Sequence, residues 1–273
     1  MARKNIFEIL AEKVDIQQQL EKIEELLSEN SIYNDSLEEV IDTYCIRDWK
    51  FRGRCTNCDD IRERLSITYY DIKLCHGNQN IVLNYLEYIV NLIWLCNTKY
   101  LEGRDDFDAE YQYLQENVTG LIEDLGYETK ILEDEERVLL LEKNAAATAA
   151  AEITPPEISN KIIEYNHFLL KGNIEEKRKI LLVLADKFEP MKNELKKVDA
   201  ILEDNIRYLL NKMNIRHNNK EGKNASEYVA NLTDEELESW YDETYQMLLL
   251  SILELDNIER NKKVKELKRI IEK

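Results

Sequence analysis

Hydrophobic residues recur every three or four positions along most of the chain, which is the period of an amphipathic α-helix. In the first half, this pattern predicts helices over residues 6–27, 36–47, 80–101 and 106–125. Asp59 and Asp60 suit the N-cap and the first turn of one more helix, because aspartate caps a helix and acidic side chains stabilise its N-terminus. The segment 80–101 is the most apolar of the set, so we expect it to form the central buried helix of the first half.

Residues 127–142 depart from this helical period. Tyr127, Thr129 and Ile131 alternate with polar or charged residues, and an acidic run then precedes the apolar segment 138–141. Alternation with a period of two is typical of a β-strand. We therefore predict a β-hairpin with an acidic turn, and a continuous helix is the alternative.

The second half returns to the helical period. Helices are predicted over the alanine-rich segment 145–151, which Asn144 caps, over 159–171, 174–188 and 195–213, and from the capping box at 233–236 to residue 271. The predicted fold class is all-α, mainly a helical bundle, with one small β-hairpin near 127–142. We expect an N-terminal helical domain over 1–126, a hairpin connector over 127–143 and a second helical domain over 144–273.

Composition agrees with long helices, because the 273 residues include only three prolines and seven glycines. The formal net charge of −18 argues against a dedicated DNA-binding protein, which normally has a basic surface. The longest apolar run, 89–96, is too short to cross a bilayer. We therefore expect a cytoplasmic protein that has no membrane partner and keeps its five cysteines reduced.

The segment 214–219 is the strongest candidate for chemistry, because it combines an arginine, a histidine and three asparagines in a locally basic region. Arginine binds phosphate through two hydrogen bonds, and histidine exchanges protons near neutral pH. Such residues can cleave RNA without a metal ion or another cofactor. We therefore identify Arg216 and His217 as candidate catalytic residues. The candidate substrate-binding residues are Asn214, Asn218, Asn219, Arg207, Lys212 and Lys220.

The alternative for this segment is a solvated loop between two helices, in which asparagine adopts left-handed backbone angles. His167, on the predicted helix 159–171, is either a packed helix residue or a side chain that faces the loop of Arg216.

Two segments of the first half offer other chemistry. Cys55 and Cys58 have the spacing of a zinc-binding pair that Cys75 or His76 could complete, and free cysteines near a helix start are the alternative. The segment 47–54 interleaves cations with Trp49 and Phe51, a combination that stacks bases and holds phosphates. A structural loop that buries both aromatic rings is the alternative there.

The segments 161–172, 181–190 and 209–219, together with 240–245, resemble bacterial helical proteins of the abortive-infection or HEPN-like group. The resemblance implies a compact helical bundle, a homodimer, and a metal-independent ribonuclease site formed across the dimer by an arginine and a histidine. Arg216 and His217 match those two residues, although they are adjacent here and the family separates them by four to six residues.

Two functions follow as expectations. The first is a bacterial anti-phage effector of the abortive-infection or toxin type that binds and cleaves RNA. The second is a non-enzymatic helical interaction protein, such as a sensor, inhibitor or adaptor in a defence system, whose partner is an antitoxin, a phage protein or a defence subunit. The net charge favours the second function, because an acidic surface repels RNA and suits a basic protein.

Overall fold

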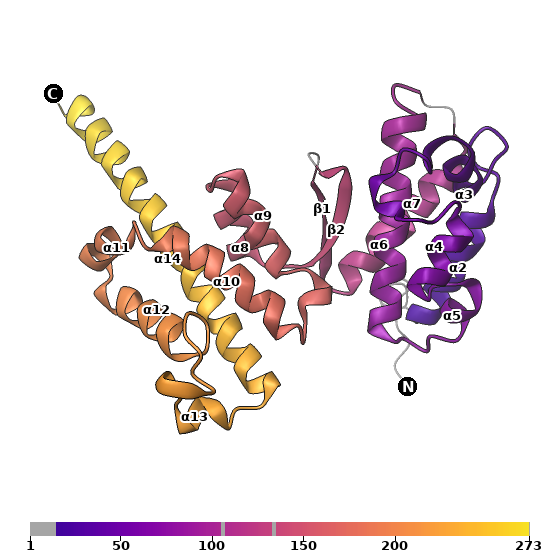
Figure 1. The fold of residues 1–273 in the computed structure, drawn as a ribbon. Coiled ribbons are helices and arrows are strands. Elements are labelled where there is room, and N and C mark those ends of the chain that lie inside the picture. Colours follow the sequence, from indigo (N-terminus) through magenta and orange to yellow (C-terminus); the bar gives the residue numbers. More distant parts are fainter. Residues whose placement is uncertain (1–14, 105–106, 133–134, 273) are drawn as a thin grey trace, which may run out of the picture. The chain divides into compact units, whose positions relative to one another are not determined.

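The computed structural model describes residues 15–104, 107–132 and 135–272, which are mostly helical (Figure 1). The chain divides into two compact units, one up to Leu141 (unit 1) and one from Glu142 (unit 2). The predicted fold class is confirmed, since helices and one two-stranded antiparallel hairpin account for the regular structure. None of the described helices combines the length and hydrophobicity that a membrane span requires.

Unit 1 is built from helices that lead into the hairpin. Its elements are α2 (Ile16–Ser28), α3 (Leu37–Val40), the π-helical turn η1 (Ile41–Cys45), the 3-10 turn η2 (Lys50–Arg52), α4 (Cys58–Leu65), α5 (Tyr69–Lys73), α6 (Gln79–Leu95), the π-helical turn η3 (Cys96–Tyr100), α7 (Ala109–Asp124), β1 (Tyr127–Leu132) and β2 (Arg137–Glu142). The first part of the helix predicted over 6–27 lies outside the described residues. The N-cap of α4 is Asn57 rather than Asp59, and both aspartates lie in its first turn.

The apolar helix α6 is buried in unit 1, and its polar residues hold the hairpin. Leu86, Ile89 and Leu92 on this helix have no exposed surface. The buried Asn91 donates a hydrogen bond to the carbonyl of Val138 and accepts one from its amide, at 2.8 and 2.9 Å. These two bonds satisfy the backbone carbonyl and amide of Val138 on β2. The amide of Leu140 also donates to the carboxylate of Glu87 at 2.8 Å, so polar side chains of α6 fix β2 in place.

Unit 2 consists of helices and short helical turns. Its elements are α8 (Ala145–Glu152), α9 (Pro156–Tyr165), the 3-10 turn η5 (Phe168–Leu170), α10 (Ile174–Phe188), α11 (Lys192–Val198), α12 (Ala200–Lys212), the 3-10 turn η6 (Gly222–Asn224), α13 (Glu227–Ala230) and α14 (Asp234–Ile271). Asn144 caps α8, and Thr233 with Glu236 forms the predicted capping box of α14.

Two helices predicted for unit 2 are wrong in extent. The helix predicted over 195–213 divides at Asp199, whose extended backbone (ψ 93°) ends α11 and whose carboxylate accepts hydrogen bonds from the amides of Ile201 and Leu202 to cap α12. Ile201 is 75% exposed and so lies outside the buried face of α12. The helix predicted over 159–171 ends at Tyr165, and His167 instead caps the short turn that follows.

The core of unit 2 forms where α14 packs on α8, α10 and α12. Tyr245 of α14 stacks on Tyr165 of α9 with ring centroids 4.0 Å apart. The buried Lys177 of α10 pairs with Glu238 and Asp242 of α14, at 2.7 and 2.6 Å. These carboxylates offset the cost of burying the ammonium group, which is strongly unfavourable without a partner.

Candidate functional site

The predicted site at 214–219 is a structured loop that follows α12. Asn214 has a positive φ of 57°, which asparagine tolerates better than most residues. Its amide donates to the side-chain oxygen of Asn219, and the amide of Asn219 donates to the side-chain oxygen of Asn214, both at 3.0 Å. Asn219 is 3% exposed and also donates to the carbonyl of Asn224 at 3.1 Å. This reciprocal pair closes the loop.

Two helices of unit 2 hold the same loop in place. Arg178 of α10 donates through Nε to the carbonyls of Asn214 and Ile215, at 2.7 and 3.0 Å. The hydroxyl of Tyr241 on α14 donates to the carbonyl of Asn214 at 3.2 Å. The loop is therefore anchored from two sides through its backbone.

The two candidate catalytic residues differ in their surroundings. The guanidinium of Arg216 pairs with Glu189 and donates to the carbonyl of Ala185, and the side chain is 20% exposed. Hydrogen bonding from Lys192, assisted by Arg216, holds the pKa of Glu189 below its ordinary value. His217 is exposed, and no described residue hydrogen-bonds or ion-pairs with its ring.

The other candidate binding residues serve the local structure or lie in solvent. Asn218 accepts hydrogen bonds from the amides of Lys220 and Glu221, and Lys220 pairs with Asp234 at 3.3 Å. Arg207 pairs with Asp204 within α12, whereas Lys212 is exposed. The positive charge that is concentrated in the sequence of this region is thus largely offset by carboxylates in space.

The geometry around Cys55 and Cys58 does not support the zinc site that their spacing suggested. All five cysteines are buried and unpaired, and residues 15–104, 107–132 and 135–272 contain no group of three metal-binding side chains. Sγ of Cys75 donates to the side-chain oxygen of Gln17, whereas Sγ of Cys58 donates to the carbonyl of Glu38. Burial raises the pKa of the Cys58 thiol far above its ordinary value, which disfavours the thiolate that binds metal.

The aromatic residues of the segment 47–54 are divided between core and surface. Trp49 is 7% exposed, as the structural alternative expected, but Phe51 is 47% exposed and its burial was wrongly predicted. The guanidinium of Arg137 lies 5.4 Å from the centroid of the Phe51 ring. An arginine of the hairpin therefore lies over one face of this ring.

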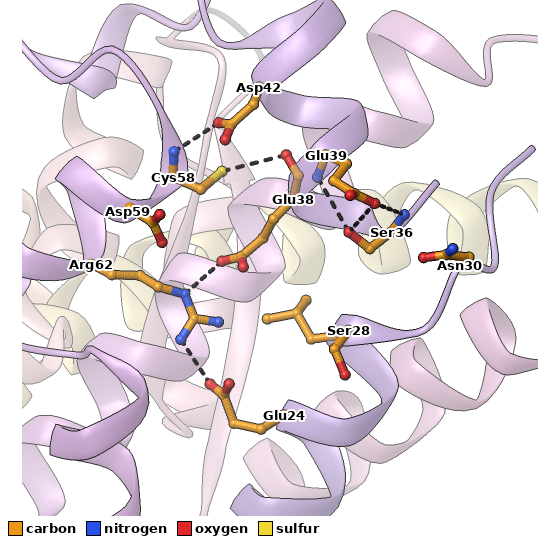
Figure 2. A pocket seen from close by; sticks show the side chains of 11 residues that line it. Glu24, Ser28, Asn30, Ser36, Glu38, Glu39, Asp42, Cys58, Asp59 and Arg62 are labelled. Carbon is orange, nitrogen blue, oxygen red and sulfur yellow. Dashed lines mark hydrogen bonds and ion pairs between the residues drawn. The ribbon is translucent and has the colours of Figure 1, made fainter. Parts of the chain in front are cut away.

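Unit 1 contains a pocket that the sequence did not reveal, with a volume of about 370 Å³ (Figure 2). It lies among α2, α3 and α4, and five carboxylates and one arginine are among its lining side chains. The lining residues are Glu24, Leu27, Ser28, Asn30, Ser36, Glu38, Glu39, Asp42, Cys58, Asp59 and Arg62.

Arg62 is the centre of this pocket. Its guanidinium donates to Glu24 at 2.9 Å and to Glu38 at 2.6 Å, and the residue is only 6% exposed. The hydroxyl of Tyr88 donates to the same carboxylate oxygen of Glu38 at 2.6 Å, and the rings of Tyr85 and Tyr88 lie 5.7 and 5.6 Å from the cation. These contacts join α2, α3, α4 and α6 through one positive charge.

The remaining three carboxylates of the pocket lack a cationic partner in the contacts described. Glu39 closes the capping box of α3, and hydrogen bonds from Ser36 lower its pKa. Asp42 accepts a hydrogen bond from the amide of Cys58 at 2.7 Å. Asp59 is exposed in the first turn of α4, and no described cation pairs with it. The pocket therefore has an excess of negative charge.

The function of either site has to be inferred from its own geometry. No protein-family model matches the chain, and no curated protein or solved structure matches it. The HEPN-like resemblance of 161–172, 181–190 and 209–219 therefore stays a prediction.

Replacing Arg62 by alanine should destabilise the protein by about 3–5 kcal/mol, because the partly buried carboxylates of Glu24 and Glu38 lose their shared, buried cation. Urea denaturation followed by circular dichroism measures this change. Arg64→Ala is the matched control, since Arg64 is exposed on the same helix, and its effect should stay within about 0.5 kcal/mol. A loss of stability below about 1 kcal/mol for Arg62→Ala would show that the ion pairs of Arg62 with Glu24 and Glu38 are not essential to the fold.

Asn219→Ala should destabilise the protein by about 1–3 kcal/mol, because the Asn214 amide and the Asn224 carbonyl lose their partners. Chemical denaturation measures the change, and His217→Ala, at an exposed position of the same loop, should leave stability unaltered. Equal stabilities for the two variants would refute the structural role of the asparagine pair.

Proposed function

We propose that this chain is a non-enzymatic helical interaction protein and that unit 1 binds a basic protein partner. The observation that carries this proposal is the division of charge between the units. Residues 1–141 contain 30 acidic and 15 basic side chains, a net charge of −15, whereas residues 142–273 contain 25 and 22, a net charge of −3. A surface with this excess attracts cationic segments and repels RNA.

The acidic pocket supplies a place for such a partner. Asp42 of η1 and Asp59 of α4 both line it, and Arg62 is already engaged by Glu24 and Glu38. A lysine or arginine side chain of the partner would meet carboxylates that retain accepting capacity. Charge-assisted hydrogen bonds of this kind confer specificity as well as affinity.

The loop at 214–219 also supports binding over catalysis. A general base acts efficiently when a second group holds its ring in one orientation. Within the described ranges no residue holds His217 in this way, and Arg216 is paired with Glu189. Asn214 and Asn219, which were expected to bind the substrate, instead bond to the loop backbone through their side chains.

A labelled lysine-rich peptide should bind the full chain, and its affinity should fall as salt screens the charges. Asp42→Asn with Asp59→Asn removes two charges from the pocket, and the asparagine oxygen can still accept the bond from Cys58. We expect this double variant to bind about tenfold more weakly, equivalent to about 1.4 kcal/mol.

The matched control is Glu110→Gln with Glu123→Gln, which removes two exposed charges of α7 outside the pocket. This control should retain most of the affinity. Equal weakening by both double variants would place the binding outside the pocket and contradict its assigned role.

The second candidate is the expected anti-phage effector, a cytoplasmic homodimer that cleaves RNA without a metal ion. The observation that favours this candidate is that His217 is exposed and follows Arg216 directly in the loop. An RNA strand bound at the loop would therefore meet both side chains. In this account Arg216 binds phosphate after its release from Glu189. His217 takes the proton of the attacking 2′-hydroxyl and gives it to the leaving 5′-oxygen, so that the phosphodiester bond breaks as the new bond to the 2′-oxygen forms.

This candidate predicts that the purified protein degrades RNA in EDTA and that His217→Ala abolishes the activity. Glu189→Gln should raise the activity, because it frees the Arg216 guanidinium. Gel analysis of a labelled RNA measures both effects. Absence of cleavage by the wild-type chain, or full cleavage by His217→Ala, would exclude the enzyme.

A further inference from the structure

The C-terminal part of α14 extends beyond the core of unit 2 (Figure 1). Tyr241, Tyr245 and Leu248 face the core and are buried, whereas every residue from 259 to 272 is exposed. Four of these exposed residues are large and apolar, with exposures of 49, 53, 72 and 73%: Val264, Leu267, Ile270 and Ile271. A long helix that exposes such side chains has an unpartnered face.

Most of these apolar residues continue a stripe that starts inside the unit. The stripe alternates steps of three and four residues, which is the spacing of the a and d positions of a coiled coil. Its members are Leu250, Leu253, Asn257, Arg260, Val264, Leu267 and Ile271. Five of the seven are apolar, and Leu250 is itself 46% exposed.

The stripe lies on a different face of α14 from the core contacts. Leu248 is 2% exposed, and Leu255, one heptad later, continues its face. Val264 follows Leu255 by nine residues, which is two and a half helical turns, so it points to the opposite side. The stripe is therefore available to a partner while the core face stays packed.

Charge along this segment indicates which partner fits. Residues 254–259 contain three acids and no base, whereas residues 260–272 contain six bases and two acids. Two parallel copies would place like charges together. Two antiparallel copies would place the acidic part of each helix against the basic part of the other, which is favourable.

We propose that a second copy of this chain pairs with the first through this stripe in antiparallel orientation. The side chains of Asn257 and Arg260 fall near the middle of the pair, where polar core positions set register and orientation and reduce stability. The stripe belongs to unit 2, whereas the acidic pocket belongs to unit 1. Loss of this pairing and loss of binding to a basic partner are therefore distinguishable.

Sedimentation of the full chain over a range of concentrations tests the pairing. We expect the mass to rise to twice that of one chain. Val264→Gln with Leu267→Gln and Ile271→Gln should restore the single-chain mass at all concentrations. The control Lys262→Gln with Glu266→Gln and Arg269→Gln alters other faces of the same segment and should leave the dimer intact. A wild-type chain that never dimerises, or a stripe variant that still does, would overturn the proposal.

Energy transfer between dyes on Glu272→Cys of separate chains tests the orientation, because the five native cysteines are buried. At a rise of 1.5 Å per residue, antiparallel pairing about residue 260 separates the two labels by roughly 35 Å. We expect partial transfer. Parallel pairing would bring the labels within about one helix diameter, and the resulting near-complete transfer would contradict the proposal.

Discussion

The packing of unit 1 depends on one buried cation, Arg62. Removing a guanidinium from water is costly, and the cost is offset only where carboxylates and aromatic faces surround it. Glu24, Glu38, Tyr85 and Tyr88 provide this environment from three different helices. The arrangement of α2, α3, α4 and α6 is therefore set by the need to keep a single positive charge satisfied.

This constraint also shapes the surface of the unit. Two carboxylates are engaged by the arginine, and the others that line the same pocket lack a cation of their own among the described contacts. The pocket thus contributes to the negative net charge of unit 1. In unit 2 a related arrangement around Lys177 joins α10 to α14, but basic and acidic side chains nearly balance. The two units therefore differ in their net charge.

Local signals in the sequence predicted much of the fold. The alternation at 127–142, the cap at Asn144 and the capping box at Thr233 each act within a few residues. The sequence pattern was therefore sufficient to predict the hairpin and the starts of α8 and α14. The break at Asp199 was missed because its side chain bonds to the backbone just as the helical period continues. The pairing of Arg216 with Glu189 and of Arg62 with Glu24 joins distant segments, and no spacing rule shows such contacts. The chemistry expected at 214–219 was inferred from residue types, and the structure places most of those side chains in bonds to the loop itself.

We propose that unit 1 recognises a basic protein and that the chain does not act on RNA. Fluorescence anisotropy of the wild-type chain with a labelled oligolysine peptide and with a labelled RNA of equal length compares the two ligands directly. The account predicts salt-sensitive binding of the peptide and no binding of the RNA at the same protein concentrations. Tighter binding of the RNA than of the peptide would contradict it.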